Sequence, residues 1–122
     1  MIAQVLEAAL AFNLVCSGMT RTGPLGLAMP EADGDPIEIV YRMNLDARLW
    51  CSGACEATER IDSIVDGTIV LRDLHYPAGS SVIMVMPALG RFTDTQVEWS
   101  SGTLISGTCR RAPFTGFGGE TA

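Results

Sequence analysis

Short segments in which apolar and polar residues alternate with a period of two run through most of this chain. Gly, Pro, Asp and Ser separate the segments at intervals of about 8 to 12 residues. Successive side chains of a β-strand point to opposite faces of the sheet, so this period is typical of strands with one buried face. In the clearest segment, 37–45, Ile37, Ile39, Tyr41 and Met43 share one face. The alternation predicts an all-β chain.

Turn residues divide the chain into a series of locally connected strands. Asp66-Gly67 is the strongest hairpin signal, because a type I′ turn needs positive φ at both central residues. Further strands are predicted over 12–19, 49–51, 61–65, 68–71, 82–86, 92–99 and 103–110, and loops over 21–24, 30–36 and 73–77. We therefore expect an antiparallel meander of seven or eight strands that closes into a small sandwich or barrel.

Four cysteines in a chain of 122 residues are typical of a disulfide framework, and they allow three connectivities. We favour Cys16 with Cys109, which ties the first strand to the last and restricts the unfolded chain by roughly 4 to 5 kcal/mol in the entropic model. Cys51 with Cys55 then closes a tight turn. Disulfides persist in oxidising compartments, so a periplasmic or extracellular location is expected.

The amino terminus has some features of an export signal. Ala9-Leu10-Ala11 follows an apolar stretch and matches a signal-peptidase site that would release a chain beginning at Phe12. However, no basic residue precedes Arg21, and Glu7 interrupts the apolar run. The predicted organisation is a signal-peptide remnant or short helix over 1–11, one all-β domain over 12–117 and a flexible tail over 118–122.

The net charge of −6 argues against a nucleic-acid surface. All eight basic residues are arginine, and only Arg110 and Arg111 are adjacent. No apolar run approaches the roughly 20 residues that span a bilayer, so no transmembrane span is predicted. The expected partner is another protein of the cell envelope, and the sequence leaves any small-molecule ligand unknown.

The segment from Trp50 to Cys55 resembles the dithiol of thioredoxin-like proteins only superficially. Three residues separate Cys51 from Cys55 instead of two, and no helix amino terminus is available to lower the pKa of the first thiol. Zinc sites bring two close pairs of ligands, whereas Cys16 and Cys109 are each solitary. We predict structural disulfides, no metal site and no cofactor.

His75, the single histidine, lies near Asp73 and would need a nucleophile and an oxyanion site to act in a hydrolase. Ser80 and Ser81 are close in sequence but are interpreted as turn residues. We therefore predict no catalytic residue.

Other acidic and apolar residues are assigned to structure. Glu38, Asp46 and Glu98 have no separation that the sequence fixes, as paired catalytic carboxylates require. The acidic residues within 31–35 lack the remainder of a calcium loop. Core packing is the expectation for two further groups of residues, namely Val82, Met84 and Met86, and the two tryptophans Trp50 and Trp99.

Several short motifs resemble a loose group of small, uncharacterised exported proteins of alphaproteobacteria. The matching positions are Cys16 and Gly18; Tyr41, Arg42, Leu45, Trp50, Cys51 and Cys55; Gly90 and Arg91; and Gly107, Thr108, Cys109, Phe114 and Phe117. The resemblance implies an exported all-β domain and brings no activity with it.

The leading hypothesis is a non-catalytic, disulfide-stabilised binding or accessory module of the cell envelope, which uses an exposed sheet edge or the mouth of a small barrel. One alternative is a structural subunit of a larger envelope or membrane-bound complex, docked through the apolar segment 2–12. Another is a small enzyme that uses His75 or the Cys51 and Cys55 pair.

Overall fold

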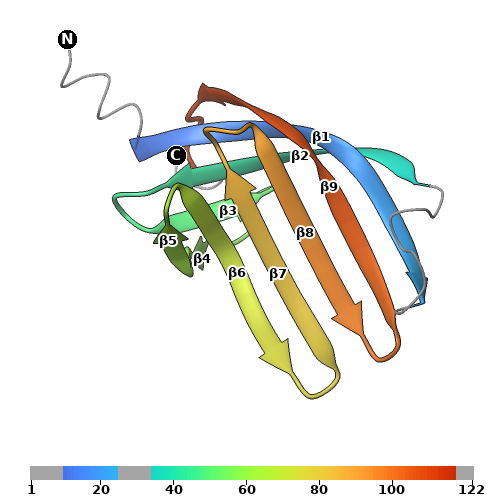
Figure 1. Cartoon of the computed structure of the whole chain (residues 1–122). Helices are drawn as coiled ribbons and strands as arrows, with labels where there is room; N and C mark the ends of the chain where they lie inside the picture. Colours follow the sequence, from blue (N-terminus) through green and yellow to red (C-terminus); the bar gives the residue numbers. More distant parts are fainter. Residues whose placement is uncertain (1–9, 25–33, 118–122) are drawn as a thin grey trace, which may run out of the picture.

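The computed structural model describes residues 10–24 and 34–117, and over these residues the chain is all-β (Figure 1). The strands are β1 (Ala11–Pro24), β2 (Asp35–Asn44), β3 (Leu49–Ser52), β4 (Glu59–Arg60), β5 (Ser63–Val65), β6 (Thr68–Tyr76), β7 (Gly79–Met86), β8 (Arg91–Glu98) and β9 (Ser101–Pro113). They form one antiparallel sheet in the order β4-β3-β2-β1-β9-β8-β7-β6-β5. The first and last strands are therefore neighbours at the centre of the sheet.

The sheet curls into a half-barrel, so that strands far apart in its order approach one another (Figure 1). Trp50 in β3 donates a hydrogen bond of 2.9 Å from its indole Nε1 to the carbonyl oxygen of Leu71 in β6. The edge strands β4 and β5 are joined in the chain by Ile61 and Asp62 alone. Among the described strands no ladder pairs β4 with β5, so the predicted closure into a sandwich or barrel is not confirmed.

One apolar core fills the inside of the curl, which we call the inner face. Its buried members are Phe12, Leu14, Cys16, Tyr41, Met43, Trp50, Ile61, Ile69, Leu71, Ile83, Val85, Phe92 and Ile105. Tyr41 lies at its centre, with ring centroids 6.1 Å from Trp50 and 5.9 Å from Phe92. Ile37 and Ile39 pack against the same core, which confirms the shared face predicted for this strand.

A second, smaller core lies on the opposite side of β3. Cys51, Cys55 and Phe117 are buried there, and Leu49 and Phe114 pack against them. The rings of Phe114 and Phe117 meet edge to face, with centroids 5.2 Å apart. The segment that follows β9 thus covers the Cys51–Cys55 disulfide.

Glycines shape the backbone at two places, a predicted turn and the centre of the sheet. Asp66 and Gly67 both have positive φ, 50° and 82°, as the predicted type I′ turn requires. At the sheet centre Gly18 lies opposite Gly107, and a Cβ atom at Gly18 would lie 2.1 Å from the carbonyl oxygen of Ser106. Only glycine allows the two central strands to approach so closely.

Several strands are longer than predicted, because pairing with a neighbour outweighs a local turn signal. Residues 21–24 continue β1, since β9 pairs with that strand as far as Pro24 opposite Ser101. The predicted loop over 73–77 is also wrong, because β6 runs to Tyr76 opposite Gly79. Ser80 and Ser81 consequently belong to β7 and not to a turn. With the short β4 and β5, the described residues form nine strands instead of seven or eight.

Two packing predictions and one strand boundary are wrong. Val82, Met84 and Met86 lie half-buried on the outer face of β7, while Ile83 and Val85 fill the core. Trp50 is 1% exposed as a core anchor should be, but Trp99 is 78% exposed in a turn. Of the predicted strand 61–65, only Ser63–Val65 pairs, because Ile61 donates its amide to Arg48 outside the sheet ladders.

Part of the terminal predictions lies outside the described residues. These are the signal-peptide remnant or helix over 1–11, up to residue 9, and the tail over 118–122. Ala11 already belongs to β1. None of the described segments is a helix with the length and hydropathy that crossing a bilayer requires.

Candidate functional site

A β-bulge in β6 aims an arginine at the inner face. The register of β6 on β7 moves from Val70 opposite Met84 to Arg72 opposite Ile83, which leaves Leu71 as the extra residue. A bulge sets two residues against one and re-aims the side chain that follows. Leu71 is buried in the core and Arg72 is half-buried at the margin of the core. The side chains of two consecutive residues therefore lie on the inner face.

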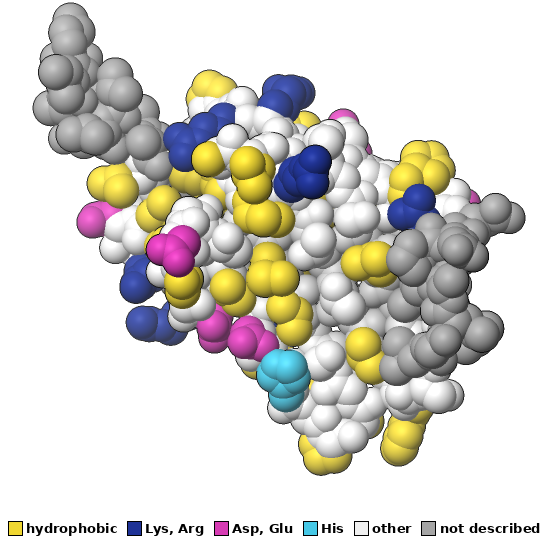
Figure 2. Space-filling model, viewed as in Figure 1, with side chains coloured by type: hydrophobic (Ala, Val, Ile, Leu, Met, Phe, Trp, Pro, Cys, Tyr) yellow, Lys and Arg dark blue, Asp and Glu magenta, His cyan; other side chains and the backbone are white. Residues whose placement is uncertain are grey.

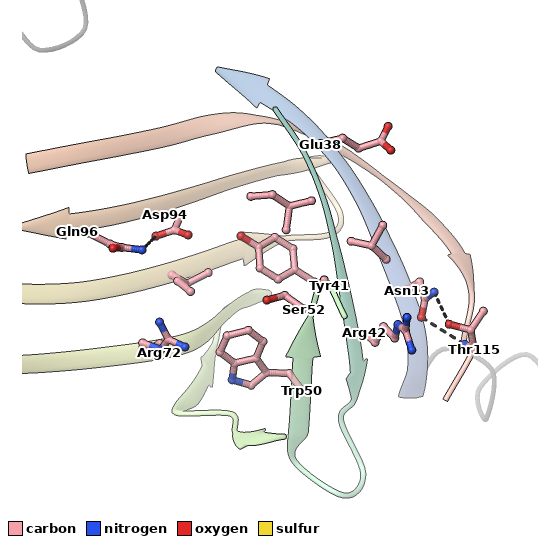
Figure 3. A pocket seen from close by; sticks show the side chains of 14 residues that line it. Asn13, Glu38, Tyr41, Arg42, Trp50, Ser52, Arg72, Asp94, Gln96 and Thr115 are labelled. Carbon is pink, nitrogen blue, oxygen red and sulfur yellow. Dashed lines mark hydrogen bonds between the residues drawn. The ribbon is translucent and has the colours of Figure 1, made fainter. Parts of the chain in front are cut away.

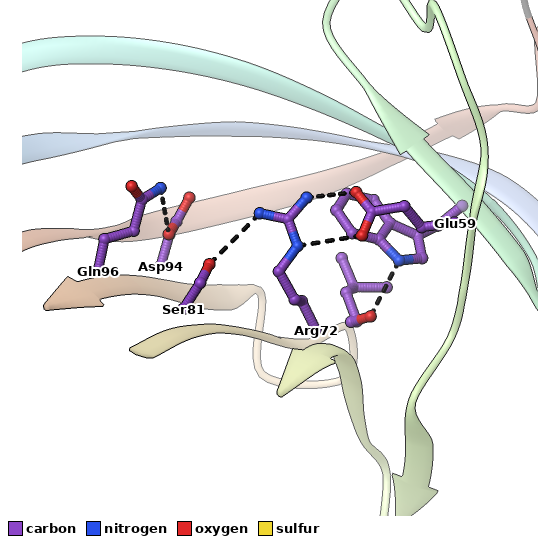
Figure 4. Close-up of polar contacts among 7 residues, drawn as sticks. Glu59, Arg72, Ser81, Asp94 and Gln96 are labelled. Carbon is purple, nitrogen blue, oxygen red and sulfur yellow. Dashed lines mark hydrogen bonds and ion pairs between the residues drawn. The ribbon is translucent and has the colours of Figure 1, made fainter. Parts of the chain in front are cut away.

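Arg72 joins three strands (Figure 4). Its guanidinium forms a bidentate ion pair with Glu59 of β4 and donates a hydrogen bond of 3.3 Å to the Ser81 hydroxyl of β7. It also stacks over the Trp50 ring, 5.4 Å from the centroid. The hydrogen bond to Glu59 raises the pKa of Arg72 further above its usual value. Each of the three guanidinium nitrogens donates a hydrogen bond, and the ion pair holds β4 against β6.

Tyr41 and Asp94 bring unsatisfied polar atoms to the same face. The Tyr41 hydroxyl is buried and has no hydrogen-bond partner in the described part of the chain, and Figure 3 shows it directed toward the side that carries Asp94. Asp94 is 7% exposed and accepts one hydrogen bond, of 3.5 Å, from the Gln96 side chain. Burial raises the pKa of both groups. The nearby charge of Asp94 raises the pKa of Tyr41 further, whereas the charge of Arg72 offsets part of the rise in the pKa of Asp94. A buried polar group without a partner is costly and is frequent at binding sites.

These side chains border a cavity of about 510 Å³ at the open margin of the sheet (Figure 3). Its lining comes from both faces of β2 as well as from the inner face of β6 to β8. The residues are Asn13, Glu38, Ile39, Val40, Tyr41, Arg42, Trp50, Ser52, Gly53, Arg72, Ile83, Asp94, Gln96 and Thr115. The size is that of a site for a small molecule or for a few side chains of a partner.

The cavity reaches both faces of β2 because this strand is only partly paired. The short β3 covers β2 from Tyr41 to Asn44, and Gly53 then donates its amide to the Val40 carbonyl. The Cys51–Cys55 disulfide closes the turn that follows, and the chain then leaves the edge of β2. Between Asp35 and Val40, this side of β2 has no strand beside it among the described residues.

The structure contains both predicted disulfides. Cys16 and Cys109 lie directly opposite each other in β1 and β9, with Cα atoms 4.0 Å apart, and Cys16 is fully buried. Cys51 and Cys55 are joined under the second core. All four cysteines are bonded, and none is free. Three of them are buried and Cys109 is half-buried, which fits structural bonds better than a redox or metal site.

His75 does meet Asp73, but the pair lies on the outer face of β6. The His75 Nε2 and an Asp73 carboxylate oxygen are 2.7 Å apart, and both side chains are exposed. Ser80 is opposite His75 on β7, yet no hydrogen bond joins their side chains. Figure 2 shows His75 on an open surface beside acidic side chains, and none of the described cavities includes it.

The remaining acidic candidates do not assemble into a site. Glu38 borders the cavity, Asp46 lies in the β2–β3 turn and Glu98 ends β8. Of the acidic stretch 31–35, only Asp35 is described, and it begins β2. No group of three His, Cys, Asp or Glu side chains in the described part of the chain could hold a metal ion.

Four residues of the cavity have no role in the sequence-based expectations: Tyr41 as a polar group, Arg72, Asp94 and Gln96. For Asp94 the alternation of β8 contains a signal. Phe92 is on the buried face of the strand, so Asp94, two residues later, lies on the same face. Arg72 has no such signal, since its orientation depends on the bulge.

Comparison of the chain with protein-family models, with curated proteins and with solved structures finds no match. The candidate site therefore has to be interpreted from its own geometry.

Proposed function

We propose that this chain is a non-catalytic, disulfide-stabilised binding module of the cell envelope, which takes an extended segment of another envelope protein along the open edge of β2. The observation that carries the proposal is the stretch of β2 from Asp35 to Ile39, which has no strand on its β3 side among the described residues and ends beside the inner-face cavity. A strand edge with free N–H and C=O groups is a template for adding a further strand.

The direction of the added strand follows from β3. Alternate residues of a strand aim their backbone groups at the same neighbour, and Val40 aims its carbonyl at the β3 side. Glu38 therefore offers both its N–H and its C=O to the open edge, while Pro36 has no N–H and limits the length of the pairing. A segment that continues the line of β3 binds antiparallel to β2.

The cavity selects side chains of that segment. Alternate side chains of an added strand point to the inner face, where the Tyr41 hydroxyl and the Asp94 carboxylate lack full hydrogen bonding. Arg72 is occupied by Glu59. The cavity thus favours a hydrogen-bond donor, such as a lysine, serine or asparagine side chain.

Location and class rest on two further observations. Two disulfides support an oxidising compartment, periplasmic or extracellular. A non-catalytic role is supported by the exposed setting of His75 and by the buried, bonded state of Cys51 and Cys55.

The test is site-specific crosslinking in the native host. A photoreactive residue at Ser52, which is exposed and borders the cavity, should crosslink to one or a few discrete proteins. Glu38→Pro removes the outward N–H and should abolish these crosslinks, while Glu38→Ala also removes the carboxylate but keeps the N–H and should retain them. The same photoreactive residue at Thr108, on the outer face, should not give them.

Absence of a discrete crosslinked species from Ser52 would count against the proposal. Crosslinks that persist in Glu38→Pro, with the fold intact by circular dichroism, would show that the partner does not use the edge of β2.

A further inference from the structure

A tryptophan stands where the backbone prefers glycine, at the tip of the β8–β9 hairpin. The two-residue turn is Trp99-Ser100, and Trp99 has φ of 57° while Ser100 does not have positive φ. Glycine is the usual residue at the first position of such a turn, because a Cβ atom disfavours this conformation. Trp99 is nevertheless 78% exposed, so its side chain gains little from folding. Stability of the fold alone gives no reason for a tryptophan here.

The neighbouring hairpin tip fixes the backbone of Trp99 but not its side chain. The Trp99 amide donates a hydrogen bond of 2.7 Å to the Ala78 carbonyl in the β6–β7 turn. Beside it the strands are pressed together, because a Cβ atom at Gly79 would lie 1.7 Å from the Val97 carbonyl oxygen. Any residue with an N–H could make this hydrogen bond. The two tips form a rigid base on which the indole is presented.

Tyr76 provides a second exposed aromatic ring at the same end of the sheet. It ends β6, is 51% exposed, and borders with Trp99 a hollow of about 320 Å³. The lining also includes Val97, Gly102 and four polar side chains, those of Gln96, Glu98, Ser101 and Thr103. Figure 1 shows the β6–β7 and β8–β9 turns side by side at the end of the molecule away from β3 and β4.

This combination matches the chemistry of a sugar ring. A pyranose has a face of C–H groups, which packs on the electron-rich face of an aromatic ring, and a rim of hydroxyls. Hydroxyls donate to the Glu98 carboxylate and exchange hydrogen bonds with the amide of Gln96 and with Ser101 and Thr103. Glu98 is the one charged side chain of the hollow and no arginine borders it, so a neutral sugar fits better than a phosphate or an acidic sugar.

We propose that the hollow between Tyr76 and Trp99 is a binding site for a neutral saccharide chain. The site is separate from the protein-binding edge of β2 and does not depend on it, although Gln96 borders both cavities. Trp99 supplies the main stacking surface, and the hydrogen bonds between the hairpin tips hold it in place before the ligand arrives, which limits the entropy lost on binding.

The experiment titrates the purified, oxidised protein with cellohexaose, maltohexaose and chitohexaose. Binding is followed by tryptophan fluorescence and calorimetry, since Trp50 is buried and Trp99 is exposed. We expect at least one of the three to bind, Trp99→Gly to weaken that binding at least tenfold, and Trp99→Tyr to retain most of it. Leu89→Ala, which changes another exposed apolar side chain in the β7–β8 turn at the opposite end, should leave it unchanged.

A second readout separates binding from folding. Because glycine suits the backbone of residue 99, Trp99→Gly should raise the melting temperature while it removes binding. A fall in melting temperature would assign Trp99 a structural role and overturn the proposal. Binding of none of the three saccharides at millimolar concentration would overturn it too, as would binding that Trp99→Gly leaves intact.

Phosphatidylcholine vesicles serve as a further probe: if wild-type protein binds them instead and Trp99→Gly does not, the tip contacts a membrane interface and the saccharide proposal is wrong. None of these outcomes bears on the crosslinks from Ser52.

Discussion

The buried environment of Asp94 disfavours its charged carboxylate. This residue is almost completely buried, and its one hydrogen bond comes from Gln96 at 3.5 Å. Burying a carboxylate is costly unless it is paired, and the nearby Arg72 is already paired with Glu59. Such a residue stabilises the fold less than an isosteric amide would. Its presence beside the cavity is therefore one more reason to assign the cavity a binding role.

The pH dependence of stability tests this view of Asp94. Burial raises the pKa of Asp94 in the folded state, so its contribution is fully present below the ordinary aspartate pKa and is lost as the pH rises through the raised value. Asp94→Asn should therefore unfold with a higher free energy than wild type at pH 7 and with the same free energy at pH 3. Urea denaturation at pH 3, 5 and 7 measures the difference.

The matched control is Asp46→Asn, which removes the same charge from an exposed turn. It should change the free energy of unfolding at pH 7 less than Asp94→Asn does. If Asp94→Asn is instead less stable at pH 7, attraction between Asp94 and Arg72 outweighs the cost of burial.

Among the elements, the central pair β1 and β9 is closely packed through two facing glycines. Gly18 and Gly107 lie opposite each other, two residues along the strands from the Cys16–Cys109 pair and on the same face. A Cβ atom at either glycine would lie within about 2 Å of a backbone carbonyl oxygen. Backbone cannot yield as a flexible side chain can, so these two positions fix how closely the strands approach.

Gly18→Ala should accordingly lower the free energy of unfolding by about 2 to 3 kcal/mol. The same substitution at Gly23, also in β1 and also opposite a glycine of β9, should cost less than about 0.5 kcal/mol, since a Cβ atom there meets nothing within 4 Å. Guanidinium denaturation of both variants gives the comparison. Equal losses would mean that strand propensity, and not the close approach, decides stability at both sites.

The sequence predicts those elements whose evidence is local. The alternation in 37–45 and the Asp66-Gly67 turn each contain their own signal, and both predictions are confirmed. The end of β1 is different, because Gly23 and Pro24 signal a turn locally and are held in the strand by β9, almost 80 residues away. Pairing over that distance cannot be predicted from a single stretch of sequence.

The candidate site was harder to predict than the fold. The sequence predicts that Tyr41 lies on the apolar face of its strand and that Trp50 anchors the core, and both are buried. The cavity, however, depends on the bulge at Leu71 and on the short length of β3. Neither feature follows from residue type. Trp99 is predicted to anchor the core because the chain is poor in aromatic residues, and its exposure is the exception that suggests a function.

For the whole molecule, the two disulfides have unequal roles. Cys16–Cys109 closes a loop with a sequence separation of 93 and joins the two central strands, whereas Cys51–Cys55 has a separation of 4. In the entropic model the stabilisation grows with the logarithm of loop length. The long-range bond should therefore dominate the stability of the domain.

Replacing Cys16 and Cys109 together by alanine should cost about 4 to 5 kcal/mol, and replacing Cys51 and Cys55 together about 2 kcal/mol. Chemical denaturation of the two double variants, each with the other disulfide intact, measures both losses. A larger loss for Cys51 and Cys55 would show that the small core with Phe114 and Phe117 contributes more than loop closure does.

The central position of β1 and β9 also determines how the domain responds to a mechanical load. The two ends of the described domain lie side by side, with Phe12 opposite Pro113, and the Cys16–Cys109 bond lies four positions further along the same pair. Tension applied to both ends would separate the β1–β9 residue pairs between Phe12 and Cys16 one after another. The Cys16–Cys109 disulfide would then carry the load. The loop that this bond closes would bear none of the tension, so both hairpin tips would keep their shape while the chain is pulled. Asn13 and Thr115, which border the cavity, lie outside that loop, so that side of the cavity would be pulled open first.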